Sequence, residues 1–107
     1  MIYEYHDALL KGRITDEIES KAVEYIAQIG EIPTFWANKL IVSYAYIITA
    51  TRHQTQAGDI YAEKIKTYSA QYASELKEAR MAQEKINASA NPAKGFTSIS
   101  TREIEIG

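Results

Sequence analysis

Apolar residues recur every three or four positions through much of the chain, which is the spacing that places them on one face of an α-helix. The clearest stripe lies within residues 16–29 and consists of Ile18, Ala22, Tyr25, Ile26 and Ile29. Thr15 precedes it as a typical N-cap residue, and Gly30 follows it as a typical C-terminal stop. The pattern therefore predicts an amphipathic helix over residues 16–29.

A shorter stripe stands near the N-terminus. Ile2, His6, Leu9 and Leu10 share one face of a helix, and Gly12 is a natural end point. We therefore predict a first helix over residues 2–11. A helix this short is marginal on its own, so it has to dock on the rest of the protein.

Residues 34–55 contain the most apolar stretch of the chain, with LIVSYAYIITA at its centre. Pro33 suits the first turn of a helix, where its missing N–H leaves no hydrogen bond unmade. The β-branched and aromatic residues also favour a strand. The segment is nevertheless too long for an ordinary strand, and no turn residue interrupts it. We expect a central helix that is covered on several sides.

The longest regular segment is predicted over residues 60–87. Gly58 ends the helix before it, and Asp59 is placed to cap it. A seam spaced by threes and fours consists of Tyr61, Ile65, Tyr68, Tyr72, Leu76, Ala79 and Ile86. At ~1.5 Å per residue the helix would be roughly 40 Å long, so its far end should project from so small a domain. The seam weakens from Lys77 onward, and we predict a protein interface at Leu76, Arg80, Met81 and Ile86.

The composition changes at residue 88. A helix-breaking linker, ASANPAKG, precedes FTSISTREIEIG, in which apolar and polar residues alternate as in a strand. A single strand has unpaired backbone groups, so it either stays disordered or adds to a sheet edge of another chain. We therefore predict a helical bundle domain over 1–87 and an extended tail over 88–107. The tail residues predicted to form a protein interface are Phe96, Ile99, Arg102, Ile104 and Ile106.

Together these segments predict a mainly α protein, a small bundle of about four helices with a long C-terminal helix and a strand-like tail. Its 107 residues suit one domain. The net charge of −2 supplies no basic excess for nucleic-acid binding. No apolar run reaches the roughly 20 residues of a membrane span, and the N-terminus lacks the pattern of a signal peptide. We therefore expect a soluble protein.

Candidate chemistry is sparse. Cysteine is absent, which excludes disulfides, thiolate zinc sites and a cysteine nucleophile. His6 and His53 lack metal-ligating neighbours at helical spacing, and acidic residues such as Glu17, which has Lys21 four positions on, suit a solvated helix face. No Glu-x-x-His pair, phosphate-binding glycine loop or hydrolase motif is present. We expect no catalytic residue, no metal and no cofactor.

Tyrosine is over-represented and accounts for eight of the eleven aromatic residues. A tyrosine buries a large ring while its hydroxyl still seeks a partner, which suits half-buried seams and protein interfaces. With no chemistry to place in a site, the composition favours a protein that works by assembling with other chains.

The stretch from Pro33 to Ala82 resembles the small head-to-tail adaptor (connector) proteins of tailed bacteriophages. The resemblance is carried by IPTFW, by a helix ending in an Arg-containing, Gln-rich turn, and by the spacing of Tyr61, Tyr68, Tyr72, Leu76 and Ala79. Those proteins are helical bundles of similar length whose extended C-terminal tail leaves the bundle. The N-terminal part of this chain does not match the family, and no single residue indicates portal binding.

The resemblance implies a structural adaptor of a phage neck. Such adaptors form a ring, commonly of twelve subunits, beneath the portal, and the tail reaches into the portal or a neighbouring subunit. The implied partners are the portal protein and further neck or tail proteins, with DNA only as passing cargo and no membrane. The implied location is the virion neck, after assembly in the host cytoplasm. A neutral to acidic lumen would keep the DNA from sticking.

Other classes remain open. One is a small helical-hairpin protein acting as a dimer, with Phe35 and Trp36 in a turn, although such proteins usually carry Trp-x-Gly and this chain has Trp36-Ala37-Asn38. Another is a regulatory or antitoxin protein whose tail folds on a partner. A helical enzyme lacks its residues. Solution mass separates the assembly classes, because a hairpin predicts a stable small oligomer, whereas an adaptor predicts a monomer or a large ring.

Overall fold

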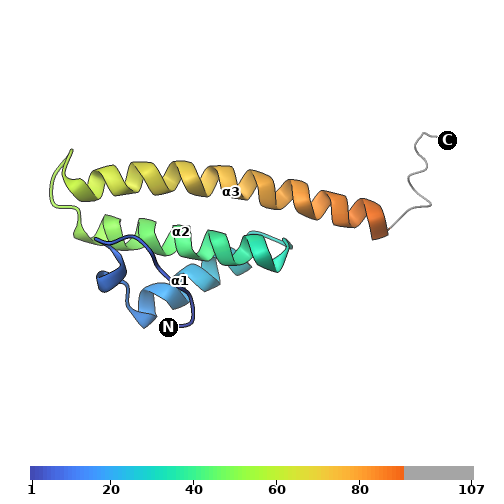
Figure 1. The fold of residues 1–107 in the computed structure, drawn as a ribbon, viewed down its shortest axis with the longest axis horizontal. Helices are drawn as coiled ribbons and strands as arrows, with labels where there is room; N and C mark the ends of the chain where they lie inside the picture. The colour runs from blue at the N-terminus through green and yellow to red at the C-terminus, as the bar shows by residue number, and fades with distance from the viewer. Residues whose placement is uncertain (91–107) are drawn as a thin grey trace.

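The computed structural model describes residues 1–90, and regular structure in that part is entirely helical. A short 3-10 helix covers Lys11–Arg13, and three α-helices follow: α1 (Asp16–Ala27), α2 (Thr34–His53) and α3 (Ile60–Ala90). Figure 1 shows α2 lying between α1 and α3, with α3 the longest element. The predicted mainly helical fold is confirmed.

Side-chain hydrogen bonds cap the starts of α1 and α3. The Thr15 hydroxyl accepts a hydrogen bond from the Ile18 amide at 3.2 Å, and Asp59 Oδ1 accepts one from the Ala62 amide at 2.8 Å. Gly30 and Gly58 have φ values of 110° and 83°, a left-handed region that favours glycine. The predicted caps Thr15 and Asp59 are therefore confirmed. The glycines lie in the links and not at the helix ends, because α1 ends at Ala27 and α2 at His53, each two residues before its predicted end. Residues 34–53 form a helix and not a strand.

The core is formed mainly by α1 and α2, together with the residues that lead into α1. Its buried apolar residues are Leu10, Ile14, Ile18, Ala22, Ile26, Leu40, Ile41, Ala45, Tyr46, Ala50 and Ala79. Ala79 is the one α3 member of this set within residues 1–90. The seam residues from Tyr61 to Leu76 are half-buried against the core, whereas Ile86 is exposed. Thus α2 is the central helix, and α3 is an outer helix that contributes one stripe.

Side-chain pairs show that α2 and α3 are antiparallel and fix their register. The ring of Tyr44 lies beside that of Tyr72, and the ring of Tyr46 lies beside that of Tyr68. Counting outward from these pairs places Thr34, the first residue of α2, level with about residue 81 of α3. Residues 83–90 of α3, which we call the overhang, therefore continue about 12 Å past the start of α2. The same extension is visible in Figure 1.

The predicted first helix over residues 2–11 is wrong. Residues 1–7, which we call the strap, cross the helices without regular structure and lead into a turn over residues 8–10 and the 3-10 helix. Gly12, predicted as a helix stop, lies within that 3-10 helix. The physical reason is that side chains bind the amides of the strap, as described below, so that its backbone needs no helical hydrogen bonds. The described residues thus hold three α-helices where about four helices were expected.

The end of α3 also differs from the prediction. The helix continues to Ala90, through residues 88–90 that were expected to begin the linker. Alanine and serine are tolerated in a helix, so the break signal in this stretch comes from the later Asn-Pro pair. The predicted strand-like tail lies outside the described residues.

Candidate functional site

The most elaborate cluster of polar groups surrounds Asp7, whose side chain is only 2% exposed. Its Oδ2 atom accepts a hydrogen bond from the Tyr68 hydroxyl at 2.6 Å and lies 2.7 Å from Lys64 Nζ. Its Oδ1 atom accepts hydrogen bonds from the amides of Leu9 and Leu10 at 2.9 and 2.8 Å. One carboxylate therefore joins the strap to α3 and also closes the turn that follows the strap.

Two further side chains hold the rest of the strap. The Tyr46 hydroxyl accepts hydrogen bonds from the amides of His6 and Asp7, at 2.6 and 3.0 Å. Glu19, a buried carboxylate on α1, accepts hydrogen bonds from the amides of Ile2 and Tyr3, each at 3.1 Å. It also accepts one from the Tyr5 hydroxyl at 2.9 Å. The strap is thus fastened to all three α-helices by side-chain hydrogen bonds.

The hydrogen bonds of this cluster also set the protonation states of its groups. Burial would raise the pKa of Asp7, but the hydrogen bonds from Lys64 and Tyr68 and from the Leu10 amide outweigh it and lower the pKa to about 2. Burial would likewise raise the pKa of Glu19, but the hydrogen bonds from the strap outweigh burial and lower that pKa below its ordinary value. Burial and the hydrogen bond to Asp7 raise the pKa of Tyr68. Groups held in one protonation state near neutral pH are poor general acids and bases.

The tyrosines form an internal seam between the helices. Tyr25 stacks on Tyr44 with ring centroids 4.1 Å apart, and Tyr44 in turn lies 5.8 Å from Tyr72. Tyr46 lies 4.4 Å from Tyr68 in the same way. Many of the tyrosines thus contact one another within the described residues, and the hydroxyls of Tyr46 and Tyr68 form hydrogen bonds with the strap.

Neither histidine gathers ligands for a metal. His53 Nδ1 lies 2.9 Å from the Thr49 carbonyl oxygen within α2, and its ring lies beside Tyr61. His6 lies at the surface with Glu4 3.9 Å away. Among residues 1–90 no three histidine or acidic side chains come together in a way that could hold a metal ion.

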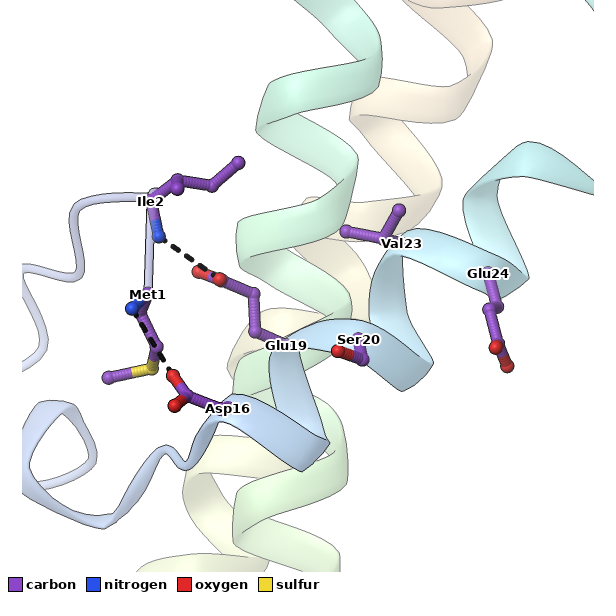
Figure 2. A pocket seen from close by; sticks show the side chains of 7 residues that line it. All are labelled: Met1, Ile2, Asp16, Glu19, Ser20, Val23 and Glu24. Atoms are coloured by element: carbon purple, nitrogen blue, oxygen red, sulfur yellow. Dashed lines mark hydrogen bonds and ion pairs between the residues drawn. The ribbon is translucent and has the colours of Figure 1, made fainter.

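Shallow hollows flank the strap. The first, of about 500 Å³, lies between the start of the strap and α1. Figure 2 shows Met1 and Ile2 on one side of it and Glu19, Ser20 and Val23 on the other. The Met1 amino group lies 3.2 Å from Asp16 Oδ1 across this hollow. A second hollow, of about 480 Å³, lies on the α2 and α3 side of the strap, and its lining includes Ile2 and Phe35.

The four α3 residues predicted to form an interface do not share one environment. Leu76 is half-buried and packs against the core. Arg80 is exposed, and its guanidinium donates a hydrogen bond to the Ile29 carbonyl oxygen at 3.3 Å, which ties α3 to the link after α1. Met81 and Ile86 are 46% and 50% exposed. Met81 and Ile86 are therefore the members of this set that present apolar surface.

The tail residues predicted to form an interface, Phe96, Ile99, Arg102, Ile104 and Ile106, lie outside the described residues. Sequence reasoning missed the strap altogether. Its signal was Asp7 followed by Ala-Leu-Leu, because an aspartate commonly accepts hydrogen bonds from the amides two and three residues on. The partners of Asp7 on α3 could not be read from spacing, since they follow it by 57 and 61 residues.

Comparison of the chain with protein-family models, with curated proteins and with solved structures finds no match. The helices described in residues 1–90 include none that is both long enough and apolar enough to span a membrane.

Proposed function

We propose that this protein is a structural adaptor, which works by docking on other protein chains through the distal part of α3 and the residues that follow it. The observation that carries the proposal is the overhang. There α3 continues past the start of α2, and Ile86 is half exposed. The seam residues before it, from Tyr61 to Leu76, pack against the core, although Ile60 at the first turn and Met81 are also exposed. The proposal takes this uncovered end of α3, together with Met81 one turn before it, as the surface that a partner covers.

The more specific form of the proposal is an adaptor of a tailed-phage neck. The chain would form a ring beneath the portal, of twelve subunits as in the adaptors it resembles, and would link the head to further neck or tail proteins. The C-terminal residues, Phe96 to Ile106, would dock on the portal or on a neighbouring subunit. The protein would be part of the virion after assembly in the host cytoplasm. The slightly acidic net charge suits a ring through which DNA passes as cargo.

Two features support a binding role over a catalytic one. The two buried carboxylates, Asp7 and Glu19, are both occupied by hydrogen bonds that fasten the strap. The tyrosine hydroxyls nearest to them are occupied in the same way. The proposal therefore assigns no residue to catalysis and requires neither metal nor cofactor.

We expect a portal gene beside the gene that encodes this chain, and the test is a reconstitution with its product. The two purified proteins are mixed, and the complex is sized by light scattering and viewed by electron microscopy. We expect a ring bound to the portal, weakened binding by the Met81→Ser/Ile86→Ser variant, and no binding by a chain that lacks residues 92–107. Ser69→Thr, an exposed change on the part of α3 that packs on α2, is the matched control and should bind normally.

Three results would contradict the proposal. The first is normal portal binding by the chain that lacks residues 92–107. The second is a stable dimer of the purified chain, which would favour the helical-hairpin alternative. The third is the absence of portal, capsid and tail genes around the gene that encodes this chain.

A further inference from the structure

The surface on both sides of the strap is hollowed and exposes large apolar side chains. The first and second hollows share Ile2. A third hollow, of about 330 Å³, lies between α1 and the start of α2 and shares Tyr3 with the second, so the three adjoin one another. Ile2 is 85% exposed and Phe35 is 63% exposed, and both line the second hollow together with the half-buried Val42. Exposed apolar side chains around a shared depression are unusual on a surface that meets only water.

The chain itself supplies a segment that can reach this hollow. Phe35 is level with about residue 80 of α3, so Ala90 lies roughly 15 Å beyond it along the helix axis. Residues 91–95 separate α3 from Phe96 and include Pro92 and Gly95, which suit a change of chain direction. A link of that length spans up to about 20 Å when extended. Residues 96–106 can therefore return to the start of α2 within one molecule.

The chemistry of the segment matches that of the hollow. In an extended conformation Arg102, Ile104 and Ile106 would share one face. The hollow offers apolar surface at Phe35, with Lys39 Nζ 5.1 Å from the centre of that ring, and carboxylates at Glu4 and Glu75. One oxygen of Glu75 accepts a hydrogen bond from the Ser43 hydroxyl at 2.6 Å. Two isoleucines on one face fit the apolar part of the lining, and Arg102 on the same face fits its two carboxylates, which outnumber the one lysine.

We propose that residues 96–106 dock in the second hollow of their own chain, where Ile104 and Ile106 cover Ile2 and Phe35. In the unassembled protein the docking segment is then bound within its own chain. A partner that binds the segment more tightly displaces it from the hollow. The inference rests on the proposed function, because it takes the same C-terminal residues as the docking segment. It adds the expectation that free subunits stay apart until they meet that partner.

The test uses Trp36, the one tryptophan of the chain, whose ring lies 5.4 Å from that of Phe35. Its fluorescence is compared between the full chain and a chain ending at Ala90, which retains every core residue of the described fold. We expect the full chain to emit at shorter wavelength and to be quenched less by acrylamide, at all protein concentrations. A synthetic peptide of residues 91–107, added to the shortened chain, should restore both properties.

A matched pair of variants locates the contact. Ile104→Ser/Ile106→Ser in the full chain should reproduce the emission of the shortened chain, whereas Thr101→Ser, on the other face of an extended segment, should leave it unchanged. Identical emission from the full and shortened chains would overturn the inference. A difference that appears only as protein concentration rises would overturn it in favour of docking on a second copy. Portal binding is measured separately, so a fluorescence result that overturns intramolecular docking leaves the proposed function standing.

Discussion

The two ends of α3 meet different surroundings. Near its start, Lys64 and Tyr68 reach the buried Asp7, and polar and aromatic contacts tie the helix to the strap and to α2. Near its end, the overhang runs past α2 and leaves Ile86 half exposed. The same helix therefore serves as part of a fold at one end and as an uncovered surface at the other. Substitutions at the first end should lower stability, and those at the second should lower assembly.

The Asp7 cluster should give the largest effect on stability. Asp7→Ala removes the acceptor for two amides and leaves Lys64 with no carboxylate partner in the cluster. We expect the free energy of unfolding to fall by about 3 kcal/mol, as measured by urea denaturation. Glu84→Ala, an acidic residue on the exposed overhang, is the control and should change it by less than about 0.5 kcal/mol. If both variants lowered the free energy of unfolding equally, the two ends of α3 would not differ in their contribution to stability.

Acid should weaken the same end of the helix. The pKa of Asp7 is about 2 in the folded protein, below its ordinary value of 3.8. A carboxylate with a lowered pKa stabilises the fold fully above its ordinary pKa, and this contribution is lost as the pH falls through the folded value. The contribution is about 2 kcal/mol. Unfolding of the wild type and Asp7→Ala between about pH 5 and pH 2 should therefore show a difference that shrinks with acid. A difference independent of pH would contradict an ionised Asp7.

Removal of the Tyr68 hydroxyl should lower the free energy of unfolding by less than removal of the Asp7 carboxylate does. Tyr68→Phe keeps the ring beside Tyr46 but removes the 2.6 Å hydrogen bond to Asp7. We expect the free energy of unfolding to fall by about 1.5 kcal/mol, because the acceptor is charged and buried. Tyr61→Phe is the matched control on the same helix, since Tyr61 contacts Arg13 and His53 through its ring. If Tyr61→Phe lowered the free energy of unfolding as much as Tyr68→Phe, the loss at Tyr68 could not be assigned to its hydrogen bond with Asp7.

The overhang should give the smallest effect on stability. Ile86→Ser should change the free energy of unfolding by less than about 0.5 kcal/mol, because the side chain is already half exposed and serine and isoleucine have similar helix propensities. Leu76→Ala, ten residues earlier on the same helix, should cost about 2 kcal/mol, because that side chain packs against the core. Thermal denaturation of both variants is sufficient to compare them. A large loss from Ile86→Ser would mean that the overhang is covered within the chain.

The helices could be predicted because their signals are local. The stripe from Ile18 to Ile29, the Thr15 cap and the glycines at 30 and 58 all act within a few residues of the structure they produce. The strap could not be predicted in this way. Its apolar spacing imitates a helix, yet its backbone is held by Glu19 and Tyr46, which follow it along the chain and meet it only in the folded protein.

The exposure of the α3 residues predicted as an interface could be read from the sequence only in part, for the same reason. Spacing placed Leu76 and Ile86 on one seam and correctly made α3 the longest helix, but spacing alone does not tell where α2 begins to cover that seam. The register of α2 against α3 decides it, and this register comes from pairs such as Tyr44 with Tyr72. Leu76 consequently packs on the core while Ile86 lies on the overhang.

The central claim is that the overhang contacts another protein chain in the assembled state. Its most direct test is site-specific photo-crosslinking in the cell that produces the protein, with the photoreactive residue placed at Ile86 or, as a control, at the exposed Ser69. We predict that position 86 crosslinks to a second copy or to a portal-type ring protein identified by mass spectrometry, and that position 69 does not. Equal crosslinking at both positions, or none at position 86, would contradict the account.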